Sequence, residues 1–133
     1  MNEKHPDMYT FASLFEQYDA AVHQGRQNNE LWLQNLTGKK RAFCEWLQKN
    51  GGVRGALSIR TIVVYVEIVS ACSGYVQSVM KLDLDFYKMD DAAILAKLAV
   101  QMYAHPYFNY FSAFLQIQPR TAVNRYLYFC RYR

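Results

Sequence analysis

The sequence predicts an all-α domain, and three observations lead to that prediction. Apolar residues recur at steps of three and four along most of the chain, which is the spacing of one face of a helix. The longest of these segments runs from Ser58 to about Lys81 without a proline. Glycine and asparagine turns separate it from shorter segments with the same spacing. We therefore expect one domain over residues 1–133, a bundle of five or six helices around a long central helix at about 58–81.

Three shorter helices are expected before the central one. They span about 7–23, 30–36 and 39–49, and residues 1–7 are expected to be frayed. Pro6 and Asp7 suit the start of the first helix, and Gly25 is typical of a residue that stops it. Gly38 breaks the second helix, and Gly51 ends the third.

The central segment has a start signal and one apolar face. The hydroxyl of Ser58 can accept a hydrogen bond from a free amide of the first helical turn. Its apolar stripe consists of Ile59, Ile62, Val63, Val66, Val69, Cys72, Val76 and Val79. The length, roughly 33 Å at 1.5 Å per residue, also suits a membrane span, and the β-branched residues suit a pair of buried strands. The helical spacing, together with Glu67, Gln77 and several serines, favours the core helix of a domain outside the membrane.

A linker and three further helices are expected after the central segment. The linker is expected at 81–89, the helices at about 92–103, 107–115 and 122–133, and a loop at 116–120. Asp90 or Asp91 caps the first of these helices, and Pro106 forces a break after it. The side chains of this helix that are expected inside are Ile94, Leu95, Leu98 and Met102. Pro119 lies in the expected loop, and Thr121 is expected to cap the last helix.

The last helix is apolar on nearly all sides, which is typical of a buried helix. One side carries Val123, Tyr126, Leu127 and Cys130, and the other carries Tyr128, Phe129 and Tyr132. Two explanations are open for the second side. Either loops of the same domain cover it, or a partner covers it, as it would in a domain cut from a longer protein.

Composition and motifs exclude several classes of function. Of the residues, 52% are hydrophobic, which is ample for a core. The three cysteines and three histidines stand far apart, which predicts neither a metal site nor a disulfide framework and favours a reduced, cytoplasmic protein. The N-terminus lacks the apolar core of a signal peptide. Phosphate-loop, dinucleotide-binding and nucleophile-elbow motifs are absent from the sequence, so we expect no enzyme and no cofactor.

Basic residues cluster near the predicted helix starts, and the net charge of +4 permits binding to nucleic acid. If these helix starts point the same way, their amides and cationic side chains form one phosphate-binding face. The expected contacts to duplex DNA are Lys39, Lys40, Arg41, Arg54, Ser58, Arg60, Thr61, Arg120 and Arg125. The two hydroxyl side chains would assist the cations. The alternative is a solvated basic surface without a ligand.

A high content of aromatic residues suggests a second function. Aromatic side chains make up 16% of the chain, and such rings are enriched at protein interfaces. A helical protein-interaction module would use Tyr107, Tyr110, Phe129 and Tyr132 to bind a second copy or a larger nucleoprotein assembly. The oligomeric state separates this alternative from a DNA-binding monomer.

Two stretches resemble helical domains of DNA-processing proteins. Residues 43–52 (FCEWLQKNGG) and 57–66 (LSIRTIVVYV) follow the pattern F-x-x-W/Y-L … G-L-S-x-x-T-I-x-x-Y. This pattern is similar to that of the SAM-like N-terminal helical domain of tyrosine recombinases and of the N-terminal helical domain of some restriction-type endonucleases. Residues 122–129 fit the last element of the endonuclease domain. The resemblance implies a SAM-like bundle that binds or positions DNA in a mobile-element or defence protein, without a cleavage domain in this chain.

Overall fold

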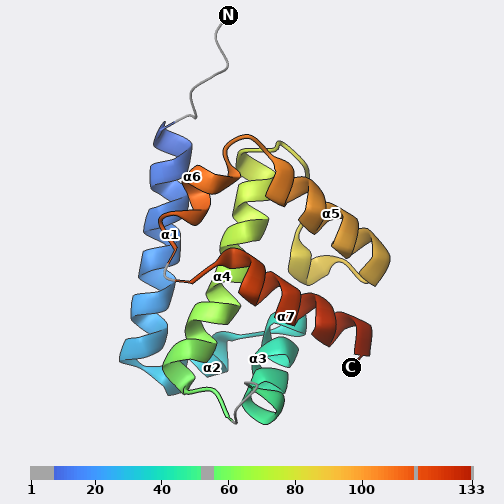
Figure 1. Cartoon of the computed structure of the whole chain (residues 1–133). Helices are drawn as coiled ribbons and strands as arrows, with labels where there is room; N and C mark the ends of the chain where they lie inside the picture. Colours follow the sequence, from blue (N-terminus) through green and yellow to red (C-terminus); the bar gives the residue numbers. More distant parts are fainter. Residues whose placement is uncertain (1–7, 52–55, 116, 133) are drawn as a thin grey trace, which may run out of the picture.

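The computed structural model describes residues 8–51, 56–115 and 117–132, which form seven α-helices, one 3-10 turn and no strand (Figure 1). The helices are α1 (Met8–Gln27), α2 (Asn29–Asn35), α3 (Gly38–Asn50), α4 (Ile59–Ser78), α5 (Ala92–Ala104), α6 (Phe108–Ser112) and α7 (Pro119–Tyr132), and the turn η1 (Phe86–Lys88) precedes α5. The all-helical class is therefore confirmed, but the described residues form seven helices where we expected five or six. The specific SAM-like arrangement remains a prediction.

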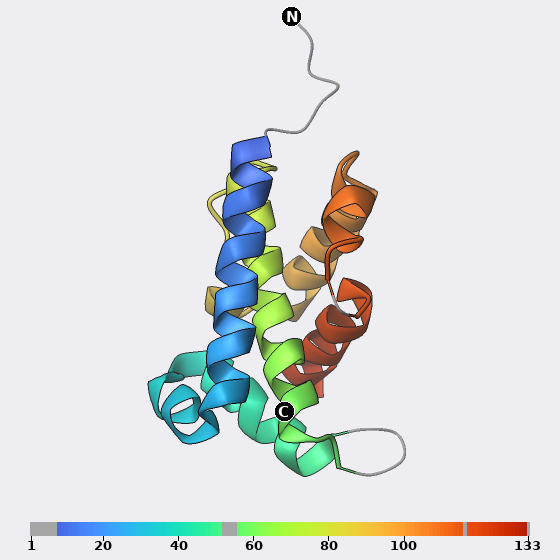
Figure 2. The ribbon, with the colours of Figure 1, turned by 90° about the vertical axis from the view of Figure 1, so that its left-hand side faces the viewer.

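Helix α4 is the axis of the fold. Helix α1 lies along it, α7 crosses it from another side, and α3 and η1 also pack on it (Figures 1 and 2). Buried residues occupy all sides of α4 between Ile62 and Val76. The predicted cap is present, because the Ser58 hydroxyl accepts a hydrogen bond from the Thr61 amide at 3.2 Å.

The environment of α4 fits the expected core helix. It is the one helix among the described residues that is long and apolar enough to cross a membrane by length and composition. However, 72% of the most apolar 18-residue stretch of this helix is buried inside the fold. Neighbouring helices of the same chain therefore already cover this apolar surface. The alternative of a pair of buried strands is wrong, since these residues form a continuous helix.

Helix α1 continues through Gly25, where the sequence predicted a stop. A Cβ atom at Gly25 would lie 2.7 Å from Cγ1 of Val63 and 3.1 Å from Cδ1 of Trp32. The glycine is therefore a site of close helix packing rather than the end of a helix. The helix ends at Gln27, and the Asn28 side chain then caps α2.

Helix α7 begins at Pro119, which the sequence placed in a loop. Proline suits the first position of a helix because its ring fixes φ and because the amide it lacks would have no partner there. Thr121 therefore lies inside the first turn and is not the cap that we expected. At α5 the expected cap is confirmed, since the Asp91 carboxylate accepts from the amides of Ala93 and Ile94 at 2.9 and 3.2 Å.

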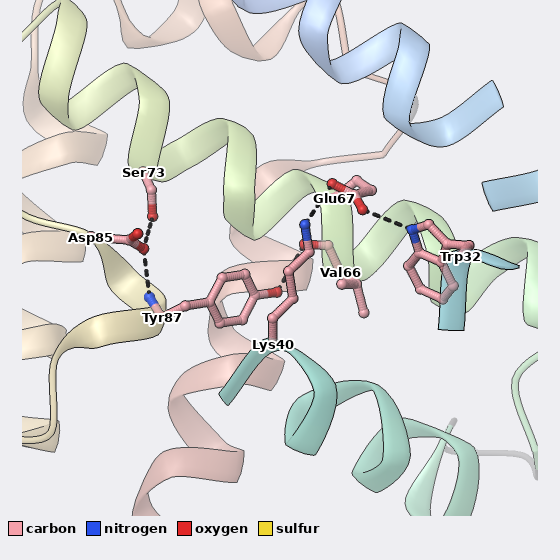
Figure 3. Close-up of polar contacts among 7 residues, drawn as sticks. All are labelled: Trp32, Lys40, Val66, Glu67, Ser73, Asp85 and Tyr87. Atoms are coloured by element: carbon pink, nitrogen blue, oxygen red, sulfur yellow. Dashed lines mark hydrogen bonds and ion pairs between the residues drawn. The ribbon is translucent and has the colours of Figure 1, made fainter. Parts of the chain in front are cut away.

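The linker between α4 and α5 folds back onto α4. The Asp85 carboxylate accepts from the Ser73 hydroxyl at 3.1 Å and from the Tyr87 amide at 2.9 Å (Figure 3). The Tyr87 hydroxyl donates to the Val66 carbonyl at 2.8 Å. These bonds hold the turn η1 against α4, so that Phe86 is fully buried.

Phe129 was expected on the surface, but it lies in the core. It is 3% exposed, and its ring centroid lies 5.6 Å from that of Phe43 and 5.8 Å from that of Trp46. Ala122, Tyr126 and Phe129 follow one another at steps of four and three, so they share the face of α7 that packs on α3 and α4. Helices of this chain therefore cover Phe129, whereas Tyr128 and Tyr132 remain more than half exposed.

Substitution of Gly25 by Ala tests the close packing of α1 on α4. The new methyl group would meet the branched, fully buried Val63, so we expect a loss of about 1–2 kcal/mol in unfolding free energy, even after the gain in helix propensity. Urea denaturation followed by circular dichroism measures the loss. The matched control is Gly74→Ala, whose Cβ would meet only the movable tip of Leu14 and should change stability little. Equal stability of the two variants would show that Gly25 is not a packing site.

Candidate functional site

Two of the cations at the start of α3 form ion pairs that differ in burial. Lys39 Nζ lies 2.6 Å from an oxygen of Asp90 and also donates to the Met89 carbonyl, and its side chain is only 13% exposed. Arg41 lies 3.4 Å from the Glu45 carboxylate, and both side chains are more than half exposed. An exposed ion pair of this kind contributes little to stability, so Arg41 can leave it to bind a phosphate. Lys39, in contrast, holds the segment before α5 against α3.

Lys40 belongs to a polar cluster in the core. It donates to one oxygen of Glu67 at 3.1 Å, and the Trp32 ring nitrogen donates to the other oxygen at 2.9 Å (Figure 3). Glu67 is 5% exposed. A buried carboxylate is stable only when it is paired, so the Lys40 side chain is occupied in holding α3 to α4.

The arginines of α7 have different neighbours. Arg125 donates to the Gly51 carbonyl and so links α7 to the end of α3. The Arg120 guanidinium lies over the Tyr103 ring, 4.6 Å from its centroid, and remains exposed. Helix α7 begins beside the middle of α4, whereas α4 begins at the lower end of the molecule (Figure 1). The starts of α7 and α4 are therefore not brought together.

The start of α4 holds Ser58, Arg60 and Thr61. The Ser58 hydroxyl donates to the Thr61 hydroxyl at 3.0 Å, so the two groups partly satisfy each other. Arg60 is exposed and forms no ion pair with any carboxylate of the described residues. Arg54, the other cation expected near this helix start, lies outside the described residues. The free charge at this site is thus that of Arg60.

The four aromatic residues that the sequence predicted for partner binding do not lie on one exposed surface. Tyr107 and Tyr110 are half-buried, with ring centroids 6.4 and 5.0 Å from that of Phe11. Tyr132 is 61% exposed and stands on the outer side of α7. Since Phe129 is in the core, only Tyr132 of the four presents most of its ring to solvent.

The outer face of α5 is a surface that the sequence analysis missed. Ile94, which was expected inside, is 51% exposed, and Val100 is 64% exposed. A groove of about 730 Å³ separates α5 from α7. Its lining includes Ala92, Ala93, Ala96, Leu127, Tyr128 and Tyr132. The available signal was the composition of α5, which has apolar residues on every side and therefore cannot bury them all against one core.

The buried polar groups do not form a reactive centre. The Tyr75 hydroxyl lies 2.7 Å from Nδ1 of His105, and burial raises the pKa of Tyr75 and lowers the pKa of His105. Both groups therefore stay neutral at neutral pH, with the hydroxyl donating to the ring nitrogen. Burial raises the pKa of the Cys44 thiol to about 11, so this thiol is not a thiolate nucleophile at neutral pH. No cluster that could hold a metal ion occurs within the described ranges.

Substitution of Lys40 by Met tests whether this cation is structural. It leaves Glu67 buried with one donor, and we expect a loss of about 2–3 kcal/mol in unfolding free energy, because the Lys40 side chain is itself partly exposed. Urea denaturation followed by tryptophan fluorescence measures it. Arg41→Met is the matched control and should cost less than about 0.5 kcal/mol. A Lys40→Met protein as stable as the control would leave Lys40 available for a ligand.

The Tyr75–His105 pair predicts a dependence of stability on pH. Because the folded state lowers the pKa of His105 below 6.5, the folded state binds fewer protons than the unfolded chain in acid. The contribution of His105 to the stability of the folded state is therefore fully present above about pH 6.5 and is lost as the pH falls below that value. We expect His105→Asn to destabilise the protein more at about pH 7.5 than at about pH 5, measured by urea denaturation. The same cost at both pH values would contradict this.

Comparison with protein-family models, with curated proteins and with solved structures finds no match for this chain. The resemblance to recombinase and endonuclease domains thus remains an expectation from short sequence motifs. Function has to be inferred from the surfaces of the fold: the apolar faces of α5 and α7, and the free cations near the start of α4.

Proposed function

We propose that this chain is a helical protein-interaction module that self-associates through the joined outer faces of α5 and α7. The observation that carries the proposal is the amount of apolar surface left open there. Tyr128 and Tyr132 line the groove, and each is more than half exposed. Val100 is 64% exposed and lies on α5 one turn after Ala96, which lines the groove. Exposed apolar side chains gathered in this way are characteristic of a binding surface.

The pattern of small residues on α5 favours a second copy as the partner. Ala92, Ala96, Val100 and Ala104 follow one another at steps of four, so they form one stripe along the helix. The order of side-chain sizes along the stripe is almost the same in both directions. In an antiparallel pair related by a two-fold axis, Ala92 of one copy faces Ala104 of the other, and Ala96 faces Val100. Small side chains at these positions allow the two helices to approach closely.

Polar groups at the edge of the groove fit the same function. Asn124 and Arg131 lie at the groove, and Lys97 lies beside Val100 on α5. An apolar centre with a polar rim is the usual construction of a protein interface. The exposed tyrosines supply rigid rings that bury a large area with little loss of conformational entropy.

Substitution of Val100 by Asp tests this surface. The wild type is expected to have twice the chain mass of 15.6 kDa by light scattering after size exclusion. A carboxylate in the centre of the interface should weaken the dimer by at least about tenfold, because it would be buried without a partner. Since Val100 is 64% exposed in the monomer, the fold should be unaffected, which circular dichroism checks.

The control variant is Leu31→Asp, which places the same charge at an exposed apolar position of α2. It should leave the dimer intact. A wild-type protein that stays monomeric at high concentration, or a Leu31→Asp variant that dissociates as readily as Val100→Asp, would exclude the proposed interface.

Binding to duplex DNA is the second candidate, and one observation favours it. Arg60 stands free at the start of α4, and the Arg41–Glu45 pair is exposed enough to open. In the recombinase and endonuclease domains that the sequence resembles, such a bundle would bind or position DNA. Because Lys39 and Lys40 are held by acidic groups, the contact would involve fewer cations than we expected from the sequence.

A mobility-shift titration with duplex DNA tests the second candidate. Affinity should fall as salt rises, and Arg60→Gln should reduce both the affinity and the salt dependence by about one phosphate contact. The matched control is Lys40→Met, which removes a cation that is already paired and should leave the affinity of the folded protein almost unchanged. Absence of binding at low salt would remove this candidate.

A further inference from the structure

A polar cleft of about 480 Å³ lies between the end of α1 and the start of α4. It is lined by Asp19, Val22, His23, Arg26, Gln27 and Arg60. Val22 is buried, and the other lining side chains can all donate or accept hydrogen bonds. Two guanidinium groups and an imidazole therefore share one cleft with a single carboxylate.

Close packing of the two helices creates this cleft. Gly25 brings the last turn of α1 against Val63 of α4, and the residue after it is Arg26. Arg60 stands about one turn before Val63 on α4. The contact that needs a glycine at position 25 thus brings together two cations that are 34 positions apart in the sequence.

Arg26 has an unsatisfied donor. Its Nε atom is buried and makes no hydrogen bond within the described part of the chain. A buried donor without a partner costs about 1–3 kcal/mol, and more when the group is charged. Most buried donors in proteins are paired, so the unpaired Nε marks Arg26 as a side chain that the fold leaves incompletely satisfied.

Within the described residues, neither arginine of the cleft has an acidic partner. No described carboxylate lies within ion-pair distance of Arg26 or Arg60, although Asp19 lines the same cleft. The lining holds two guanidinium groups and a single carboxylate, so positive charge is in excess there. The cleft therefore attracts an anion.

We propose that this cleft binds a phosphate group, either the terminal phosphate of a nucleic acid or that of a small phosphate monoester. Guanidinium groups bind the oxygens of phosphate through paired hydrogen bonds, and the Arg26 side chain forms part of the cleft wall. Arg60 supplies the second guanidinium from the other wall, and His23 adds ring donors. This site is independent of the α5–α7 surface and does not require the protein to bind duplex DNA along its length.

Titration of the isotope-labelled full chain with inorganic phosphate, followed by heteronuclear NMR at low ionic strength, tests the site. Saturable shifts are expected at the Nε–H groups of Arg26 and Arg60. Arg60→Gln should weaken binding by at least about tenfold, because a hydrogen bond to a charged group is lost. Asp19→Asn should strengthen binding by about threefold, because a like charge is removed.

Two matched variants distinguish binding at a defined site from nonspecific attraction by the positive charge of the protein. Arg120→Gln removes the same charge from an exposed arginine at the start of α7 and should leave phosphate binding unchanged. Arg26→Lys keeps the charge and removes the guanidinium fork, so it should bind more weakly than wild type. Shifts that never saturate, or equal losses in Arg60→Gln and Arg120→Gln, would overturn the proposal.

Oligonucleotides with and without a 5′-phosphate distinguish the two sources of the phosphate group. A phosphorylated end that binds at least about tenfold more tightly than the 5′-hydroxyl form, in the wild type but not in Arg60→Gln, assigns the site to nucleic-acid ends. Equal binding of the two oligonucleotides, with inorganic phosphate still bound at the cleft, assigns it to small phosphate monoesters.

Discussion

The arrangement of the helices depends on the buried carboxylate of Glu67. It lies in the middle of α4, 5% exposed, and its two oxygens accept hydrogen bonds from Lys40 and Trp32. Because Trp32 belongs to α2 and Lys40 to α3, these two bonds fix both helices against the axis of the fold (Figure 3). Apolar contacts tolerate several packings, but a buried charge requires its donors.

In this arrangement of helices, the charged and the apolar side chains lie on separate surfaces. The cations of α3 are used mainly to hold neighbouring segments, while the apolar outer faces of α5 and α7 remain open. Helix α1, whose last turns line the cleft, lies on the other side of α4 from α5 and α7 (Figure 1). The two proposed surfaces thus share no residue, and a partner on one leaves the other accessible.

The sequence predicted most helices to within a few residues and failed at positions decided by packing. Gly25 was taken as a stop, but a glycine in the last turns of a helix also permits close approach, and only the position of Val63 distinguishes the two. Phe129 and Ile94 were placed on the wrong sides of their helices. Both helices are apolar on several sides, so their sequences do not say which side faces the core.

The amino-acid sequence by itself determined the helical class, the cap at Ser58, a cap at Asp90 or Asp91 and the break at Pro106. These features depend on contacts within a few residues, which local chemistry defines. Only the tertiary structure decided which cations are neutralised and which are free. Lys40 binds Glu67 across 27 positions, and Arg26 and Arg60 line one cleft between α1 and α4, because distances between side chains on different helices are set by packing.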